Sequence, residues 1–185
     1  TCYNHLSTSL RTPETDGKKL QTRDMLHISL KDLQADEIYD YIVCHHPSKL
    51  GGEESSRPKR LAAMTALKEM CDSLANRNLI VMGDFNDVPS AAQFDMLDSS
   101  LVNKSDSLHA AGRGTIRYEG KWELIDMFLV SPHISDNTEM EIVKVPFLMT
   151  RDTKHPGEKP LRTYSGPRHL GGVSDHLPVV LYFRK

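Results

Sequence analysis

Residues 79–87 have the sequence LIVMGDFND, in which four apolar residues are followed directly by a polar turn that contains glycine. A short, wholly apolar run is typical of a strand that is buried on both faces of a sheet. Such a strand would carry the carboxylate of Asp84 and the amide of Asn86 to the edge of the sheet on a rigid element. A carboxylate there can hold a metal ion or position a water molecule. Because Asp, Asn and Gly are also ordinary turn formers, a plain strand-to-turn junction is the alternative.

The sequence on the N-terminal side of this stretch predicts two strands and two loops. Residues 25–30 and 37–44 are rich in Ile, Tyr and Val, and a polar turn separates them. Residues 7–19 and 47–56 are polar and contain Pro or Gly, which predicts loops.

A helix is predicted between residue 56 and residue 76. Ser55 or Ser56 can cap it, and Pro58 suits its first turn. Apolar residues recur every three or four positions along it and form one stripe: Leu61, Met64, Leu67, Met70, Cys71 and Leu74.

The C-terminal side predicts strands at residues 122–130, 140–145 and 177–183. A shorter helix at residues 91–97 can be capped by Ser90. Residues 150–169 form a long loop with several cations, which is typical of a functional rim. Several strands with two helices favour a layered α/β fold with mixed or antiparallel sheets.

Composition limits the class of protein. The 185 residues correspond to one domain over residues 1–185, and no apolar run is long enough to span a membrane. A net charge of −2 argues against a protein that coats nucleic acid non-specifically, because that activity needs a basic surface. Three cysteines are too few for a disulfide framework. No compartment is predicted.

Asp126 lies within the apolar strand predicted at residues 122–130. With a strand period of two it shares a face with Leu124, Phe128 and Val130. A carboxylate on an apolar face must be paired or neutralised, and we expect His176 to be its partner. If Asp126 instead faces solvent at a sheet edge, it carries no function.

Two further groups of polar residues come next to predicted strands. Asp175 and His176 precede the last strand, where one can bind Mg²⁺ or Mn²⁺ and the other can act as an acid, a base or a phosphate contact. His45 ends the strand predicted at residues 37–44 and continues the face of Val43. The alternative for Asp175 and His176 is a plain surface turn, and the alternative for His45 is a structural histidine.

Taken together and in this order, these motifs resemble the endonuclease/exonuclease/phosphatase superfamily, to which deoxyribonuclease I belongs. GDFND at residues 83–87, an Asp within an apolar strand, and SDHLP at residues 174–178 carry the resemblance. The stretch HHPSKLGG at residues 45–52 is similar to the family's strand-end histidine motif. The resemblance covers residues 22–183. It implies a deoxyribonuclease I-like four-layer α/β sandwich.

The resemblance also implies roles for the carboxylates and the amide of the site. Asp84 would orient the attacking water and contact the metal ion, which would be Mg²⁺ or Mn²⁺. Asn86 would bind the phosphate or the metal ion, and Asp175 would be a metal ligand.

For the basic residues, the resemblance implies contacts with phosphate. His176 would contact the scissile phosphate while Asp126 holds its ring. His45 would be the strand-end histidine that contacts phosphate. Arg23 resembles an Arg that often precedes the strand at residue 25 in the family, and it would bind substrate phosphate.

The chain departs from the family pattern at two places. Cys44 and His46 stand where the family often has Asn and a large apolar residue. The family also has an N-terminal half that supplies an Asn on a strand and a Glu that is the principal metal ligand, and nothing before Thr22 is expected to supply them. The chain is therefore expected to be the C-terminal part of the domain, without its N-terminal strands.

These features predict a divalent-metal-dependent hydrolase of phosphate ester bonds, most simply a nuclease-like phosphodiesterase. The alternatives are a phosphomonoesterase or a lipid phosphodiesterase of the same superfamily, and a catalytically incomplete binding module. The expected partner is a phosphate-ester substrate, with nucleic acid among the candidates, and no protein partner is predicted. Cations in the loop at residues 150–169 can hold an anionic substrate or be merely solvated.

Overall fold

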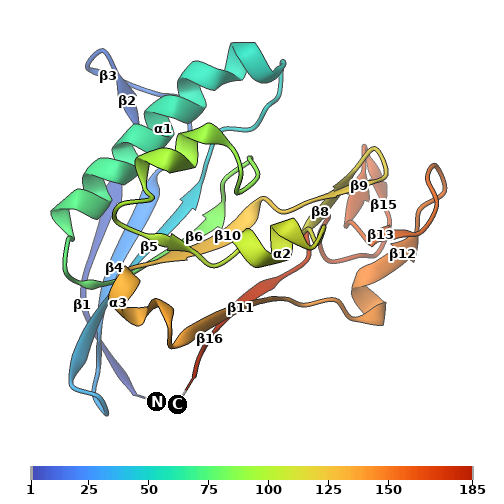
Figure 1. Ribbon diagram of the computed structural model, residues 1–185. Helices are drawn as coiled ribbons and strands as arrows, with labels where there is room; N and C mark the ends of the chain where they lie inside the picture. The colour runs from blue at the N-terminus through green and yellow to red at the C-terminus, as the bar shows by residue number, and fades with distance from the viewer. Residues whose placement is uncertain (1, 185) are drawn as a thin grey trace.

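The LIVM stretch forms β6 (Asn78–Asp84), which lies inside a six-stranded sheet of order β1-β4-β5-β6-β10-β7 (Figure 1). The computed structural model describes residues 2–184. The other strands of this sheet are β1 (Tyr3–Arg11), β4 (Met25–Asp32), β5 (Glu37–His45), β10 (Asp126–Val130) and β7 (Val102–Asn103). β5 and β6 are parallel, and the other neighbouring strands are antiparallel. The sheet is therefore mixed, as predicted.

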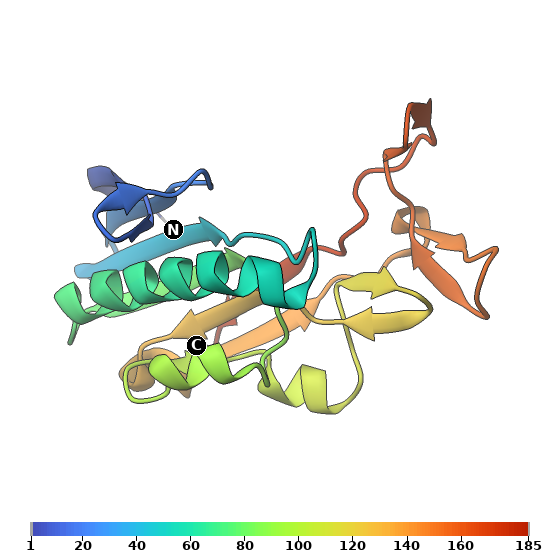
Figure 2. The ribbon, with the colours of Figure 1, turned by 90° about the horizontal axis from the view of Figure 1, so that it is seen from above.

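One face of this sheet is covered by α1 (Glu53–Ser73), the crossover that allows β5 and β6 to be parallel (Figure 2). Met64, Leu67 and Cys71 of the predicted stripe are buried against Val81 of β6. Leu61 is an exception because 48% of it is exposed.

The start of α1 differs from the prediction. Gly52 precedes the helix with a φ of 108°, a conformation that favours glycine. The hydroxyl groups of Ser55 and Ser56 donate back to the carbonyl oxygens of Gly51 and Gly52, so neither serine caps the helix. Glu53 opens the first turn, where its charge interacts favourably with the helix dipole.

The opposite face of the sheet packs against an antiparallel pair, β11 (Thr138–Ile142) and β16 (Val179–Phe183). A second core lies between them and includes Ile80 of β6, Phe128 of β10 and Met140 of β11. The helix, the mixed sheet and the strand pair together form an α/β sandwich.

An arm of short hairpins projects from one end of the sandwich (Figure 1). The hairpins are β8 (Ile116–Tyr118) with β9 (Lys121–Glu123), β12 (Met149–Arg151) with β13 (Glu158–Pro160), and β14 (Tyr164–Ser165) with β15 (Arg168–His169). The turn η2 (Pro146–Leu148) leads into the second hairpin. The predicted loop at residues 150–169 therefore contains four short strands.

The strand predicted at residues 122–130 is divided into β9 and β10. The chain leaves the hairpin at Leu124 and Ile125, where the Ile125 carbonyl accepts a hydrogen bond from the Phe85 amide at 2.8 Å. Residues 124–125 are buried, so the apolar pattern continues through the break and hides it.

The N-terminal segment was predicted as a loop but is largely extended. Its residues 7–11 belong to β1, and β2 (Glu14–Thr15) pairs with β3 (Lys18–Lys19). All nine residues of β1 are exposed, so no buried face imposes the apolar alternation that marks a strand in sequence.

Short helical turns complete the structure. They are η1 (Ala92–Met96), α2 (Asp106–Ala110) and α3 (Pro132–Ser135). Ser90 does not cap η1, because its hydroxyl lies 3.1 Å from His109 Nε2 instead. Within residues 2–184, no helix combines the length and the apolar character needed to cross a membrane.

Candidate active site

Three strand ends meet at the edge of the sheet next to the arm. In the parallel register of β5 and β6, His45 lies opposite Asp84, and in the antiparallel register of β6 and β10, Asp84 lies opposite Asp126. The three side chains therefore form a row across adjacent strands, on the face of the sheet that packs against β11 and β16. His45 Nε2 lies 3.3 Å from Asp84 Oδ2.

His176 joins this row from the segment before β16. Its backbone forms an isolated bridge with Ile116, and the next residue, Leu177, donates its amide to the Thr115 carbonyl at 2.7 Å. These contacts place His176 Nδ1 2.8 Å from Asp126 Oδ2, the pairing expected from the sequence. Such a carboxylate holds the imidazole ring in one orientation and increases its basicity.

Asp84, Asp126 and His176 form a compact set of potential metal ligands. One ligand atom of each lies within 4.8 Å of the others, and all three side chains are partly buried. Burial raises the pKa of Asp84, and the charge of Asp126 raises it further, against the hydrogen bond from the Asn86 amide. Two neighbouring carboxylates of this kind fit a hard divalent cation such as Mg²⁺, which prefers oxygen ligands.

The two histidines of the site have opposite electrostatic settings. The hydrogen bond to Asp126 raises the pKa of His176, and the charges of Asp84 and Asp175 act in the same direction, against burial. Burial lowers the pKa of His45, helped by the charge of Arg23, while Asp84 opposes it. The environment therefore shifts His176 toward the cationic form and His45 toward the neutral form.

The backbone at Gly83 brings β6 unusually close to β5. A Cβ atom at this position would lie 1.8 Å from the carbonyl oxygen of Cys44, and the φ of Gly83 is 144°. Only glycine allows this approach, which sets the spacing between His45 and Asp84.

Asn86 is held in place by two hydrogen bonds. Its amide nitrogen donates to Asp84 Oδ1 at 2.8 Å, and its Nδ2 donates to the His46 carbonyl at 2.8 Å. Its φ of 51° is left-handed, a conformation that Asn tolerates better than most residues. One Nδ2 hydrogen and Oδ1 have no partner among the described residues, so Asn86 can still contact a ligand.

A partly buried ion-pair network supports the GDFND turn, and the sequence analysis did not predict it. Asp87 Oδ1 accepts a hydrogen bond from Lys49 Nζ at 2.8 Å, and its Oδ2 lies 3.6 Å from Nε of the buried Arg60. Arg60 also pairs with Glu53. The network joins the turn, the loop after β5 and α1 into one unit. Its sequence signal is slight: Arg60 stands one turn before Met64 and two turns before Leu67, on the same side of the helix as the apolar stripe.

The structure places two other predicted residues beside the row. Asp175 Oδ2 lies 3.3 Å from Arg162 Nη2, and about half of its side chain is exposed, so it is outside the cluster of Asp84, Asp126 and His176. Arg23 lines a cavity beyond His45. The metal role of Asp175 and the phosphate role of Arg23 stay predictions.

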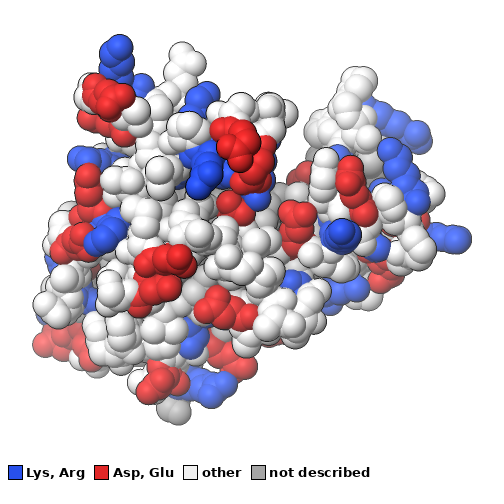
Figure 3. All heavy atoms as spheres, turned by 45° about the horizontal axis from the view of Figure 1, so that its top comes forward, with Lys and Arg blue, Asp and Glu red and all other residues white. Residues whose placement is uncertain are grey.

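A notch separates the body from the arm on the face shown in Figure 3. The arm side holds a cavity of about 700 Å³ that is lined by cations and acids together. Lys159 pairs with Asp152 at 3.2 Å, and Arg162 pairs with Asp175. Two of the cations of this loop are thus paired with acids.

Comparison with known proteins adds a family and a fold. The sequence profile of the endonuclease/exonuclease/phosphatase family matches residues 3–185. No curated protein matches the chain in sequence.

Several solved structures have the same fold. The catalytic domain of human nocturnin with a bound sulfate anion has a TM-score of 0.55 at 18% identity, over 76% of this chain and 50% of that one. A mannosyl-6-phosphatase from Bacteroides thetaiotaomicron has a TM-score of 0.59 at 15% identity, over 98% of this chain and 67% of that one. D. rerio TDP2 complexed with single-strand DNA product has a TM-score of 0.59 at 12% identity, over 96% of this chain and 66% of that one. The chain therefore spans between half and about two thirds of the length of these structures.

Proposed function

Because the chain belongs to the endonuclease/exonuclease/phosphatase family, we propose that it hydrolyses phosphate ester bonds, with phosphodiesters as the preferred class and a divalent cation as cofactor. The observation that carries this proposal is the row of His45, Asp84 and Asp126 at three adjacent strand ends, with His176 held by Asp126.

The two neighbouring carboxylates would hold Mg²⁺ or Mn²⁺. Asp84 and Asp126 lie on the same sheet edge, and Asp175 is a further candidate ligand from the adjoining segment. When bound, the cation supplies positive charge that stabilises the negative charge developing on phosphate in the transition state.

The side chains of the site would orient the attacking water and stabilise the phosphate. Asp84 lies at the centre of the row, where its carboxylate can orient the water molecule that attacks phosphorus and accept a proton from it. His176 is shifted toward its cationic form and stabilises the phosphoryl oxygens, while Asp126 fixes its ring. Asn86 and His45 would contact the phosphate on the side of Asp84 that faces β5, opposite to Asp126. The bond from phosphorus to the leaving oxygen breaks as the water oxygen adds.

The first test is hydrolysis of bis(p-nitrophenyl) phosphate with Mg²⁺ or Mn²⁺, with the cation removed by a chelator as a blank. We expect Asp84→Asn and His176→Ala each to lower kcat by about 10²- to 10⁴-fold, because each removes proton transfer or charge stabilisation. Matched controls are Asp95→Asn and His5→Ala, which change exposed residues outside the row and should leave the rate unchanged.

Activity that survives both site variants would contradict the proposed roles of Asp84 and His176. If the rates fall equally in the controls, the loss comes from misfolding and not from the chemistry. Turnover of DNA, inositol phosphates and sphingomyelin then distinguishes a nuclease from a phosphomonoesterase or a lipid phosphodiesterase.

A further inference from the structure

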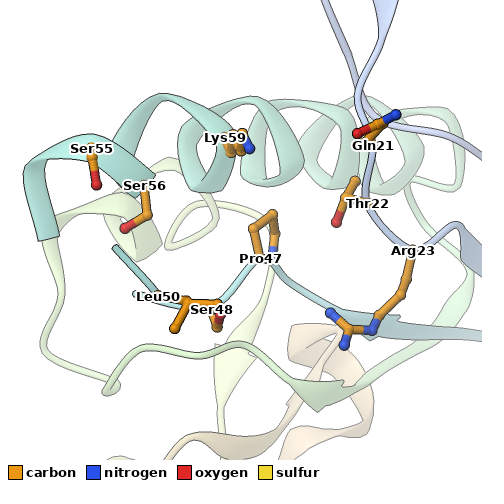
Figure 4. Close-up of a pocket in the computed structure, with 9 residues that line it drawn as sticks. All are labelled: Gln21, Thr22, Arg23, Pro47, Ser48, Leu50, Ser55, Ser56 and Lys59. Atoms are coloured by element: carbon orange, nitrogen blue, oxygen red, sulfur yellow. Dashed lines mark hydrogen bonds between the residues drawn. The ribbon is translucent and has the colours of Figure 1, made fainter. Parts of the chain in front are cut away.

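A cavity of about 660 Å³ opens beside the His45 end of the row. Three segments line it: the residues before β4, the loop after β5, and the first half of α1 (Figure 4). Its lining residues are Gln21, Thr22, Arg23, Pro47, Ser48, Leu50, Ser55, Ser56 and Lys59.

The lining of this cavity is positive, and none of the described residues that form it is acidic. Arg23 and Lys59 come from different segments, and among residues 2–184 neither side chain forms an ion pair with a carboxylate. The cations of the arm are different, because Lys159 and Arg162 are paired with acids. An anion entering the cavity beside β5 therefore meets two cations whose charge no acid neutralises.

Hydroxyl groups complete the set of donors. The Thr22 hydroxyl has no partner among the described residues, and Ser48 Oγ accepts only a long bond of 3.4 Å from the Leu50 amide. Ser55 and Ser56 already donate to the Gly51 and Gly52 carbonyls and instead hold the turn that forms the wall. Figure 4 shows the Arg23 guanidinium extending beneath Pro47 toward Ser48.

The cavity adjoins the proposed reaction site. Leu26 pairs with Val43, so the segment that carries Arg23 runs beside the residues that follow His45. Pro47 and Ser48, which line the cavity, follow His45 by two and three residues. A molecule whose phosphate lies on the row can therefore extend a neighbouring group into the cavity.

We propose that this cavity binds a second phosphate group of the substrate, with Lys59 as the residue that selects it. The inference rests on the proposed function and makes it more specific. A substrate with two phosphates should be preferred over one that carries only the scissile phosphate. The second phosphate can be the next linkage of a nucleic-acid strand or a separate monoester on a small molecule.

The test compares pairs of substrates that differ by one phosphate. The strand pair is the dinucleotide dTpdT and the trinucleotide dTpdTpdT, and the small-molecule pair is inositol 1-phosphate and inositol 1,4-bisphosphate. We expect kcat/KM to rise about tenfold with the second phosphate in one pair, as one charge-assisted contact provides. The pair that shows the increase identifies the source.

The variant that tests the cavity is Lys59→Gln, and its matched control is Arg57→Gln. Arg57 is an exposed cation of the same helix, two positions away, that does not line the cavity. Lys59→Gln should abolish the preference for two phosphates, and Arg57→Gln should retain it. Equal kcat/KM within both pairs, or a preference that survives Lys59→Gln, would overturn the inference.

A binding measurement decides the matter if no substrate is hydrolysed, which would count against the proposed function alone. Calorimetric titration with inorganic pyrophosphate in the presence of a chelator reports the anion site without catalysis. Lys59→Gln should raise the Kd about tenfold, and Arg57→Gln should not. Equal binding by the wild type and Lys59→Gln would show that the cavity is not an anion site.

Discussion

At the scale of single residues, His46 is a polar side chain in an apolar setting. Only 1% of it is exposed, and neither ring nitrogen has a hydrogen-bond partner among residues 2–184. Its ring packs edge-on against Phe85, with ring centroids 5.1 Å apart. Its backbone serves the site, because the His46 carbonyl holds the amide of Asn86. The imidazole group therefore adds an unsatisfied polar surface that the backbone function does not require.

We predict that His46→Leu raises the free energy of unfolding by about 1–2 kcal/mol at neutral pH, because it removes unpaired polar atoms from the core. Urea denaturation measures the change. His5→Leu, at an exposed position of β1, is the control and should have little effect. A less stable His46→Leu protein would show that the imidazole has a partner that compensates for its burial.

The same substitution should change the response to acid. Burial lowers the pKa of His46 from 6.5 to about 4. Below pH 6.5 the unfolded chain takes up a proton that the folded protein resists, so the wild type loses stability as the pH falls toward 4. The loss can reach about 3 kcal/mol and should be smaller in His46→Leu. If the free energy of unfolding changes with pH by the same amount in the wild type and in His46→Leu, this account is wrong.

At the scale of elements, the contact between β5 and β6 depends on one glycine. Gly83 lies opposite Cys44 in the parallel register. Its φ is 144°, and a Cβ atom there would overlap the carbonyl oxygen of Cys44. This contact aligns His45 with Asp84. The stability of the sheet and the geometry of the site therefore share one cause.

We predict that Gly83→Ala costs about 3 kcal/mol or more of unfolding free energy, since it combines backbone strain with a steric clash. Gly112→Ala is the matched control, because Gly112 has a φ of 71° and a Cβ atom added there would have no neighbour within 4 Å in the described part of the chain. It should cost only the strain, about 1–2 kcal/mol. Denaturant unfolding of the two variants measures the difference, and equal losses would exclude the close approach as the cause.

At the scale of the whole molecule, the sandwich and the arm differ in how they are held. The sandwich has two apolar cores, whereas the arm consists of hairpins of two or three residues a strand. Arg117 joins two of these hairpins, because its guanidinium donates to the carbonyls of Gly120, Pro156 and Glu158. The arm is thus organised by polar contacts around one side chain.

We predict that Arg117→Met accelerates amide hydrogen exchange at residues 152–160 without changing exchange in β6. The reason is that the hairpin loses its donors while the cores stay intact. Arg151→Met, at an exposed cation of the same arm, is the control. Hydrogen-exchange mass spectrometry resolves both regions. Unchanged exchange at residues 152–160 would show that Arg117 does not order the arm.

Much of the fold and of the site could be predicted where the information is local. The LIVM run of β6 and the stripe of α1 identify buried elements because a core imposes periodicity on the residues that face it. The same logic marks Asp126 as a carboxylate on an apolar face that needs a partner. β1 was not predicted because its residues are exposed, so they lack the apolar alternation that a core imposes on a strand.

The order of residues along the chain is thus enough to identify the buried strands and helices and the polar residues that end them. Which of these ends meet depends on the folded structure: the register that sets His45 beside Asp84, the contact of Asp87 with Arg60, and the cavity that Lys59 lines. The difference arises because burial leaves a local, periodic pattern along the chain. Contacts between segments far apart depend on sheet register and helix packing, which no short stretch of residues encodes.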